Sequence, residues 1–481
     1  MRPGNMLFIM SDEHRRDTMG CAGHPQVRTP NLDRLAASGT RFTDAYCNSP
    51  ICVPSRASFA TGRYPHQIGF WDNGTPYDGS VPSWGHRLQQ NGNPVASIGK
   101  LHFRSTEDAN GFDEEIIPLH VVDGVGDLVG LVREGAPPRK AALKLAADAG
   151  RGDSSYQRYD DQIVAAAVEW LERKGRQAGK PWALFVSMVC PHFPLVARPE
   201  WFDLYPEAGV PMPHSYELSE RPSHPFIRAT TEIAIYDKGF DDEAKVRRAI
   251  AAYFGMVSFL DSNVGKLMGA LERAGLMDET RVVYTSDHGD NLGNRGLWGK
   301  SNMYEDAAGI PLIMAGPDIP AGIVCHEPVS LVDGFPTILD CVGAPRTDRD
   351  LPGASLFEIA RGVGPTRTVF SEYHASGSVT GAFMIRKGRF KYVYYAGMPP
   401  QLFDLDADPL ESRDLGVEPG YAGLAADCER ALRAVCDPDA VDRQAKADQR
   451  RRIEALGGRE KVLARGSFGY SPPPGTQAVY S

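Results

Sequence analysis

Charged residues follow four short apolar segments of the chain, and their types suit metal binding and proton transfer. They are Asp12-Glu13, Lys100-Leu101-His102, Pro191-His192-Phe193-Pro194 and Asp287-His288-Gly289-Asp290. Carboxylates and imidazoles bind divalent cations, whereas lysine and histidine stabilise negative charge or carry protons. The sequence therefore offers candidate metal ligands and candidate acid–base groups at four separate places.

The apolar segments have the length and composition of buried β-strands. They cover residues 6–10, 94–98, 182–189 and 281–285, and a fifth such segment covers 311–314. Helical patterns lie between them at 29–35, 161–174 and 245–274, so strands alternate with helices as in an α/β layered domain. Open α/β sheets bind ligands beyond the carboxyl ends of their strands. We therefore expect the charged residues to converge at one edge of a sheet.

Length and composition exclude several classes of protein. A chain of 481 residues exceeds the size of a single core, and its net charge of -9 argues against nonspecific partners such as nucleic acid or an anionic membrane. The first apolar run is too short for a signal peptide, and no stretch approaches the roughly 20 apolar residues that span a bilayer, so we expect a cytoplasmic protein. The eight cysteines are scattered, which favours buried thiols over a disulfide framework.

The most specific string in the chain is CNSPICVPSRASFATGR, residues 47–63. Its Cys52, Pro54 and Arg56 resemble the Cys-x-Pro-x-Arg signature of the sulfatase family, and Thr61-Gly62-Arg63 matches the later part of that signature. The resemblance implies that a separate formylglycine-generating enzyme oxidises Cys52 to formylglycine, whose hydrated aldehyde is the nucleophile. A buried structural thiol is the alternative interpretation of Cys52.

The resemblance also implies how such a nucleophile would act. One hydroxyl of the aldehyde hydrate attacks sulfur, and the other later loses its proton so that the carbonyl re-forms and sulfate is expelled. Arg56 would orient the hydrate and help to hold the metal-binding carboxylates.

A divalent cation is the implied cofactor, with Asp12, Glu13, Cys52, Asp287 and His288 as candidate ligands. The carboxylates suit calcium, and the imidazole favours a borderline metal such as manganese. Many arylsulfatases carry Asp-Asp and Asp-Asn where this chain has Asp12-Glu13 and Asp287-His288, a departure more similar to choline sulfatases and phosphonate monoester hydrolases. The alternatives are a turn cap for Asp12, a core histidine for His288, and a Glu13 side chain that faces away.

The remaining candidate site residues are assigned roles by the same resemblance. Lys100 would contact the sulfate and the nucleophile, and His102 would be the base that deprotonates the covalent hemiacetal; a solvated lysine beside a packed histidine is the alternative. His192 and Lys300 would bind sulfate oxygens near the leaving group, and either could protonate it. Asn73 would donate to the bound anion, or it belongs to a plain Asn-Gly turn.

The resemblance covers most of the chain, from residues 5–12 to the segment at 401–409. It implies an alkaline-phosphatase-like mixed sheet sandwiched by helices, with a catalytic domain over 1–367 and a smaller C-terminal α+β domain over 368–481. The expected function is hydrolysis of a small anionic sulfate ester. A phosphonate monoester or phosphodiester hydrolase with the same nucleophile and an unconverted anion-binding protein remain alternatives. A homo-oligomer, dimer or tetramer, is also expected.

Three later features of the chain carry further expectations. A hairpin is predicted over 383–395 across Lys387-Gly388, and helices are predicted between 421 and 456. The segment 121–155 is either a lid or a surface insertion. The tail from Gly466 is either an arm that docks on a neighbouring subunit or a disordered end.

Overall fold

The computed structural model describes residues 2–363 and 367–480, and its centre is a mixed eight-stranded sheet. Across the sheet the strands are β11 (Ile323–Cys325), β2 (Gly39–Phe42), β10 (Leu312–Ala315), β9 (Thr280–Ser286), β1 (Asn5–Asp12), β7 (Ala183–Pro191), β4 (Val95–Lys100) and β5 (Glu114–Leu119). Strand β10 runs antiparallel to both its neighbours, and the other pairs are parallel. The predicted α/β class with a mixed sheet between helices is confirmed.

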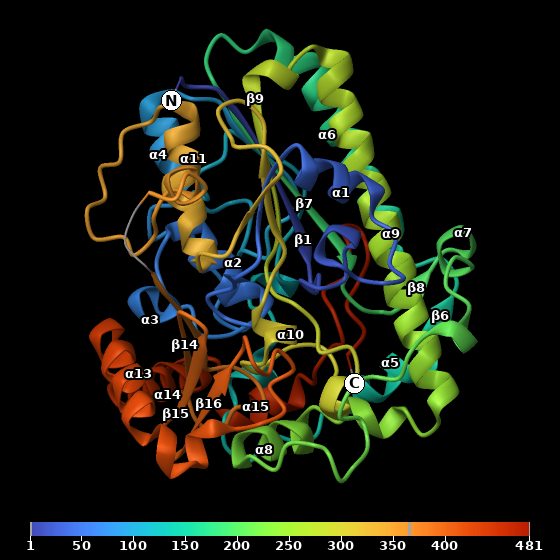
Figure 1. Cartoon of the computed structure of the whole chain (residues 1–481), viewed down its shortest axis with the longest axis vertical. Coiled ribbons are helices and arrows are strands. Elements are labelled where there is room, and N and C mark those ends of the chain that lie inside the picture. Colours follow the sequence, from blue (N-terminus) through green and yellow to red (C-terminus); the bar gives the residue numbers. More distant parts are fainter. Residues whose placement is uncertain (1, 364–366, 481) are drawn as a thin grey trace.

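Strand β1 shows why both faces of the sheet are covered. Met6, Phe8 and Met10 lie in one hydrophobic core, and the alternating Leu7 and Ile9 lie in the other. A strand that is apolar on both faces must be buried on both faces. The helices α2 (Cys52–Thr61), α4 (Trp84–Asn91) and α11 (Gly334–Val342) cover one face, and α1 (Pro30–Ala37), α6 (Ser155–Trp170) and α9 (Glu243–Ala274) cover the other (Figure 1).

The predicted elements have somewhat different ends in the structure. Helix α6 begins at Ser155, earlier than predicted, because the Ser154 side chain caps it by accepting from the Gln157 backbone N–H, and it continues into a π-helical turn at Leu171–Gly175. The shorter elements are α3 (Pro65–Ile68), α5 (Lys144–Asp148), α7 (Pro199–Phe202), α8 (Pro225–Ile233), α10 (Glu305–Ala308) and α12 (Leu356–Ile359), with the strand pairs β3 (Ala45–Tyr46) with β12 (Val329–Ser330) and β6 (Gly150–Arg151) with β8 (Val196–Ala197). Among the described residues, none of the helices combines the length and the apolar composition needed to cross a membrane.

Strand register brings the predicted charged residues to one edge. Asp12, at the end of β1, pairs with Pro191 of β7, and Ser11 pairs with Ser286 of β9. His192 and Asp287 come directly after these strand ends. The carboxyl ends of β1, β7 and β9 therefore deliver Asp12, His192 and Asp287 to the same place, as the sequence predicts.

A separate four-stranded antiparallel sheet forms most of the C-terminal part. Its strands, in order, are β13 (Thr368–Tyr373), β14 (Ala382–Lys387), β15 (Phe390–Tyr395) and β16 (Met398–Asp404), and α13 (Ala422–Val435), α14 (Pro438–Ala455) and α15 (Arg459–Ala464) follow. The predicted hairpin is the β14–β15 pair, in which Lys387 faces Phe390. The smaller α+β part is confirmed, but the boundary between 1–367 and 368–481 stays a prediction, and Met1, Ser481 and residues 364–366 lie outside the described residues.

The described part of the tail is ordered against its own chain, which differs from the predicted disordered end, while docking on a neighbouring subunit stays a prediction. Tyr156 donates its hydroxyl to the Ser471 carbonyl at 2.7 Å, and the Tyr156 and Tyr470 rings pack edge to face. The segment 121–155 is also packed: its short helical turns bury Leu128, Leu131 and Val132 against Val462 of α15. The sequence did not predict these contacts of the tail because they are single contacts without a periodic pattern.

Candidate active site

Cys52 is the first residue of α2, a helix whose ten residues are all buried. Its thiol donates to Asp12 Oδ1 over 3.7 Å, and its Sγ lies 3.2 Å from His288 Nε2. Burial and the nearby Asp12 raise the pKa of the thiol to about 11, although Lys300 and Lys100 act in the opposite direction. An unmodified Cys52 therefore stays a neutral thiol near pH 7, which makes it a weak nucleophile by itself.

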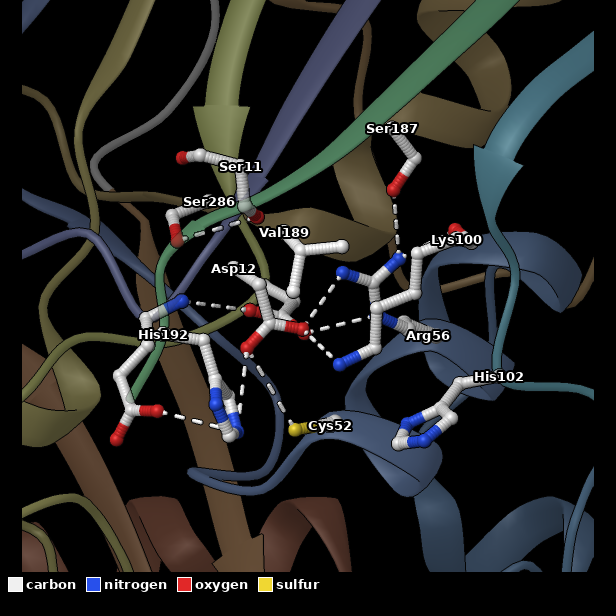
Figure 2. A network of polar contacts seen from close by, with 12 residues as sticks. Ser11, Asp12, Cys52, Arg56, Lys100, His102, Ser187, Val189, His192 and Ser286 are labelled. Carbon is white, nitrogen blue, oxygen red and sulfur yellow. Dashed lines mark hydrogen bonds and ion pairs between the residues drawn. The ribbon is translucent and has the colours of Figure 1, made fainter. Parts of the chain in front are cut away.

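Arg56 lies one turn further along α2 and connects three strand ends. Its guanidinium donates to Asp12 Oδ2 at 2.9 Å and to Asp287 Oδ2 at 2.8 Å, and also to the Lys100 carbonyl and the Ser187 hydroxyl. The planar fork of arginine suits several fixed acceptors at once. These contacts fit the predicted role of Arg56 in holding the carboxylates, which stays a prediction. Figure 2 shows the contacts of Arg56 with Asp12 and Ser187.

Four predicted ligands of the cation converge at the start of α2. One atom each of Asp12, Cys52, Asp287 and His288 lies within 4.8 Å of all the others, and all four residues are buried. His288 Nδ1 lies 3.0 Å from the Gly289 carbonyl, which can only accept, so this nitrogen carries the proton and Nε2 presents its lone pair to the cluster. Two carboxylates and a free imidazole lone pair form a donor set that fits a divalent cation.

The electrostatics of Asp12 support this interpretation. Burial by itself would raise the pKa of the carboxyl, but Lys100, His192 and Arg56 hold it well below its usual range. Lys100 Nζ, at the end of β4, lies 2.6 Å from Asp12 Oδ2. Asp12 is therefore an anion at neutral pH even though it is fully buried, as a metal ligand must be.

Glu13 lies beside this cluster but faces a different group. Its backbone is in the left-handed region with φ 67°, and its Oε2 accepts from Lys300 Nζ at 2.8 Å. Burial raises the pKa of the carboxyl well above its usual range, and Asp290, which is in hydrogen-bond contact with Glu13, raises it further against the charge of Lys300. Glu13 forms a second possible ligand group with Asp12 and His192, so its predicted place in the cation site stays a prediction.

His192 and Lys300 are in direct contact. Lys300 Nζ lies 2.9 Å from His192 Nε2, and His192 Nδ1 lies 2.6 Å from the Phe193 carbonyl, so Nδ1 is the donor and Nε2 accepts from Lys300. Burial and the Lys300 charge lower the pKa of His192 well below its usual range. Burial would also lower the pKa of Lys300, but Cys52, Glu13 and Asp12 raise it well above its usual range. The proton of this pair therefore lies on Lys300.

His102 and Asn73 complete the predicted set. His102 Nε2 lies 2.8 Å from Ser471 Oγ of the tail, and burial, assisted by Lys100 and Arg56, lowers the pKa of the imidazole well below its usual range. Asn73 Oδ1 accepts from the backbone N–H of Val53, the residue that follows Cys52, at 3.1 Å. Asn73 thus holds the start of the helix that carries Cys52, whichever of its two predicted roles applies.

Several residues of the site were not found from the sequence. Ser187 lies in an apolar strand and gives no signal in the sequence, yet its hydroxyl accepts a hydrogen bond from Arg56. The Tyr156 ring packs against His192, and the Tyr156 hydroxyl donates to the Ser471 carbonyl of the tail. Asp290, in a motif that the sequence did single out, lies close enough to raise the pKa of Glu13. Ser471 is separated from His102 by 369 residues, and no local signal connects them.

A cavity of about 290 Å³ lies beside the site, between the tail and the segment 139–148. Its lining includes Phe193, Tyr236, Phe468 and Tyr470, together with Lys144. A second cavity of similar volume is lined by Tyr236, Trp298 and Lys300 on the other side of Tyr236. The first cavity meets the site at Phe193, the residue after His192, and the second meets it at Lys300.

Comparisons with known proteins agree with the site. Residues 4–344 match the family model described as Sulfatase, and residues 293–437 match the model of the N-sulphoglucosamine sulphohydrolase C-terminal region. The chain is 35% identical to a choline-sulfatase of Rhizobium meliloti (strain 1021), with 93% of this chain and 90% of that protein covered. It is 28% identical to arylsulfatase K of Danio rerio, with 91% and 85% covered.

Solved structures show the same fold. A phosphonate monoester hydrolase of Agrobacterium radiobacter superposes with a TM-score of 0.72 at 22% identity, covering 90% of this chain and 95% of that one. A structure solved in complex with its substrate D-glucosamine-2-N,6-O-disulfate also has a TM-score of 0.72, at 25% identity, covering 91% and 99%.

Proposed function

This chain belongs to the sulfatase family and is a sulfuric ester hydrolase, and we propose that it hydrolyses sulfate esters of small alcohols with a formylglycine made from Cys52 and one divalent cation. The observation that carries the proposal is the convergence of Asp12, Asp287 and His288 on the buried Cys52 at the start of α2. A structural thiol would need none of these groups around it. The choline-sulfatase relative supports a small alcohol as the leaving group.

The cation would be held by Asp12, Asp287 and His288, with Glu13 as a further candidate ligand. When bound, it supplies Lewis-acid stabilisation of negative charge on the sulfate and on the nucleophile. Manganese and calcium both fit two carboxylates, and the imidazole nitrogen of His288 favours manganese. Titration of the purified chain with each metal, measured by calorimetry, would identify the tighter ligand.

The other side chains suit the two proton transfers of the reaction. An alcohol that leaves from sulfur needs a proton. Lys300 carries one, and its Nζ lies against His192 Nε2. His192 would then hold Lys300 in place and bind a sulfate oxygen. His102 is neutral and its Nδ1 has no partner among the described residues, so it suits the base that removes a proton from the sulfated hydrate. Arg56 and Lys100 would keep Asp12 oriented throughout.

Formation of the nucleophile is tested by peptide mass spectrometry after coexpression with a formylglycine-generating enzyme. Trypsin releases residues 42–56 as one peptide that contains both Cys47 and Cys52, so Cys47 is an internal control. We expect Cys52 to be replaced by an aldehyde while Cys47 remains an alkylatable thiol. An unmodified Cys52 under these conditions would contradict the proposal and favour an anion-binding protein.

The reaction is tested on a panel of sulfate, phosphonate and phosphodiester compounds that share one leaving group. We expect the highest kcat/KM for the sulfate ester, and loss of turnover in Cys52→Ala. A higher kcat/KM for the phosphonate monoester would overturn the substrate class while leaving the nucleophile intact. The predicted homo-oligomer stays a prediction.

A further inference from the structure

The C-terminal tail crosses the catalytic edge of the sheet and contacts two groups of the site. Ser471 Oγ lies 2.8 Å from His102 Nε2, and the Ser471 carbonyl accepts from the Tyr156 hydroxyl at 2.7 Å. The Tyr156 ring packs edge to face against both His192 and Tyr470, with centroid distances of 5.7 Å and 5.1 Å. The tail is thus joined to both histidines that have proposed roles in the reaction.

His102 depends on this contact for its orientation. The imidazole is 5% exposed, and its backbone is in the left-handed region with φ 59°. Within residues 2–363 and 367–480, His102 Nδ1 has no hydrogen-bond partner, and the partner of Nε2 is Ser471. If the Ser471 hydroxyl accepts from Nε2–H, Nδ1 keeps a free lone pair, which is the state that a base requires.

The tail also forms a wall of the cavity on the leaving-group side. Phe468 and Tyr470 line it opposite Lys144 and Leu145, and Phe193 lines it next to His192. Lys300 Nζ lies 4.9 Å from the centre of the Phe193 ring. Lys300 itself lines the second cavity, and Tyr236 lines both cavities. An alcohol that departs from sulfur towards Lys300 would therefore leave between the two cavities, and a larger alcohol would extend past Phe193 into the cavity at the tail. At roughly 30 Å³ for each water, about 290 Å³ holds a group the size of one small ring or a short branched chain.

We propose that the tail is part of the active site: Ser471 positions the His102 imidazole, and Tyr470 with Phe468 forms the outer wall of the leaving-group cavity. Ser471 is a positioning residue, since it acts through His102. Tyr470 and Phe468 are specificity-determining residues, since they limit the size of the alcohol. This inference rests on the proposed function for the roles of His102 and Lys300.

The positioning of His102 is tested first without turnover, on the chain with unconverted Cys52 and no added metal. Diethyl pyrocarbonate modifies neutral imidazoles, and peptide mass spectrometry reports the extent at each histidine. We expect Ser471→Ala to raise the modification rate of His102 several-fold relative to the exposed His326, because the ring loses its partner. Ser471→Thr, which keeps the hydroxyl, should restore protection, and Ser80→Ala, at an exposed serine, should change nothing.

Kinetics then separate the two parts of the proposal. His102 is assigned to the step after the alcohol has left, so Ser471→Ala should lower kcat for 4-nitrophenyl sulfate about tenfold and enlarge the initial burst of nitrophenolate. Ser471→Thr should recover most of the rate. Tyr470→Ala should instead change KM, improving kcat/KM for a bulky naphthyl sulfate relative to ethyl sulfate by at least fivefold.

Each outcome decides something about the tail. If Ser471→Ala matches Ser80→Ala in both His102 modification and burst size, Ser471 has no positioning role. If Tyr470→Ala leaves the naphthyl-to-ethyl ratio unchanged, the tail is not the cavity wall. Failure of the proposed function looks different, because the wild-type protein would then show no aldehyde at position 52 and no sulfate ester turnover. Thermal unfolding of each variant identifies any that fails to fold.

Discussion

Replacing Arg56 by lysine keeps the charge of the site and removes the fork that organises it. The guanidinium donates to four acceptors: Asp12 Oδ2, Asp287 Oδ2, the Lys100 carbonyl and the Ser187 hydroxyl. A lysine side chain has a single ammonium group. That group cannot reach the carboxylate on β1 and the one in the loop after β9 while also bonding to the Lys100 carbonyl and the Ser187 hydroxyl. At least two charge-assisted hydrogen bonds are lost, each worth about 1.5–3 kcal/mol. We expect Arg56→Lys to lower the free energy of unfolding by about 3 kcal/mol.

The same change should weaken metal binding, because Asp12 and Asp287 lose the group that fixes their orientation. Residues that orient metal ligands typically contribute about 10- to 100-fold to metal affinity. The assay is urea unfolding with and without added manganese or calcium, together with calorimetric titration of the folded protein. A bound cation stabilises the folded state in proportion to its affinity. Arg56→Lys should therefore show a smaller gain in stability from the metal than the wild-type protein does.

Arg281 provides a matched control for this experiment. It is 2% exposed and donates to the Arg2 and Pro317 carbonyls and to Asp318, but it is the second residue of β9 and so lies at the opposite end of that strand from Asp287. Arg281→Lys should also destabilise the fold, yet leave the metal-dependent gain in stability unchanged. If both variants lost that gain equally, or neither did, Arg56 would not be organising a cation site.

Three further predictions follow from the structure. Lys300→Met should lower kcat/KM for an ethyl sulfate ester by about 10² to 10³, and for 4-nitrophenyl sulfate by far less, since nitrophenolate leaves without a proton; an equal loss for both would contradict its acid role. His288→Ala should weaken manganese binding at least tenfold by calorimetry, while the exposed His326→Ala should not. Burial would raise the pKa of Glu372, but His66 and His374 lower it from 4.5 to about 2. This carboxylate therefore stabilises the fold above pH 4.5, and the effect is lost as pH falls towards 2. The difference in unfolding free energy between wild type and Glu372→Gln should therefore shrink by about 3 kcal/mol over that range, and a constant difference would refute the assignment.

The parts of the fold that the sequence predicts are those with a local pattern. Strand β1 is a short apolar run that ends abruptly at Asp12, and α9 repeats apolar residues at helical spacing, so both are visible within a single window. The hairpin of β14 and β15 has a turn at Gly388, with φ 57°, a conformation that glycine adopts readily. Convergence at the sheet edge follows because parallel strands end on the same side.

The details of the site depend instead on backbone conformation and on distant contacts. Asp12 and Glu13 are neighbours in the sequence, but the left-handed backbone of Glu13 turns its carboxylate to Lys300. No composition or spacing predicts that conformation for a glutamate. Ser471 is a serine in a segment rich in proline and glycine, a pattern typical of disorder, and only the folded structure brings it to His102.

The charged core of the site and its apolar cavity meet different parts of a substrate. Arg56, Lys100 and Lys300 face Asp12, Asp287 and Glu13 around Cys52, and burial raises the pKa of Glu13, so these carboxyl groups carry no more charge than the three cations. A bound divalent cation would leave this core positive, which suits any ester that carries a single negative charge, including sulfate and phosphonate monoesters alike. The alcohol, in contrast, meets the apolar lining of Phe193 and Tyr470. Substitutions in the tail should therefore change the preferred alcohol and leave the ratio of sulfate to phosphonate activity unchanged, a separation that measurements on two esters of each acid would test.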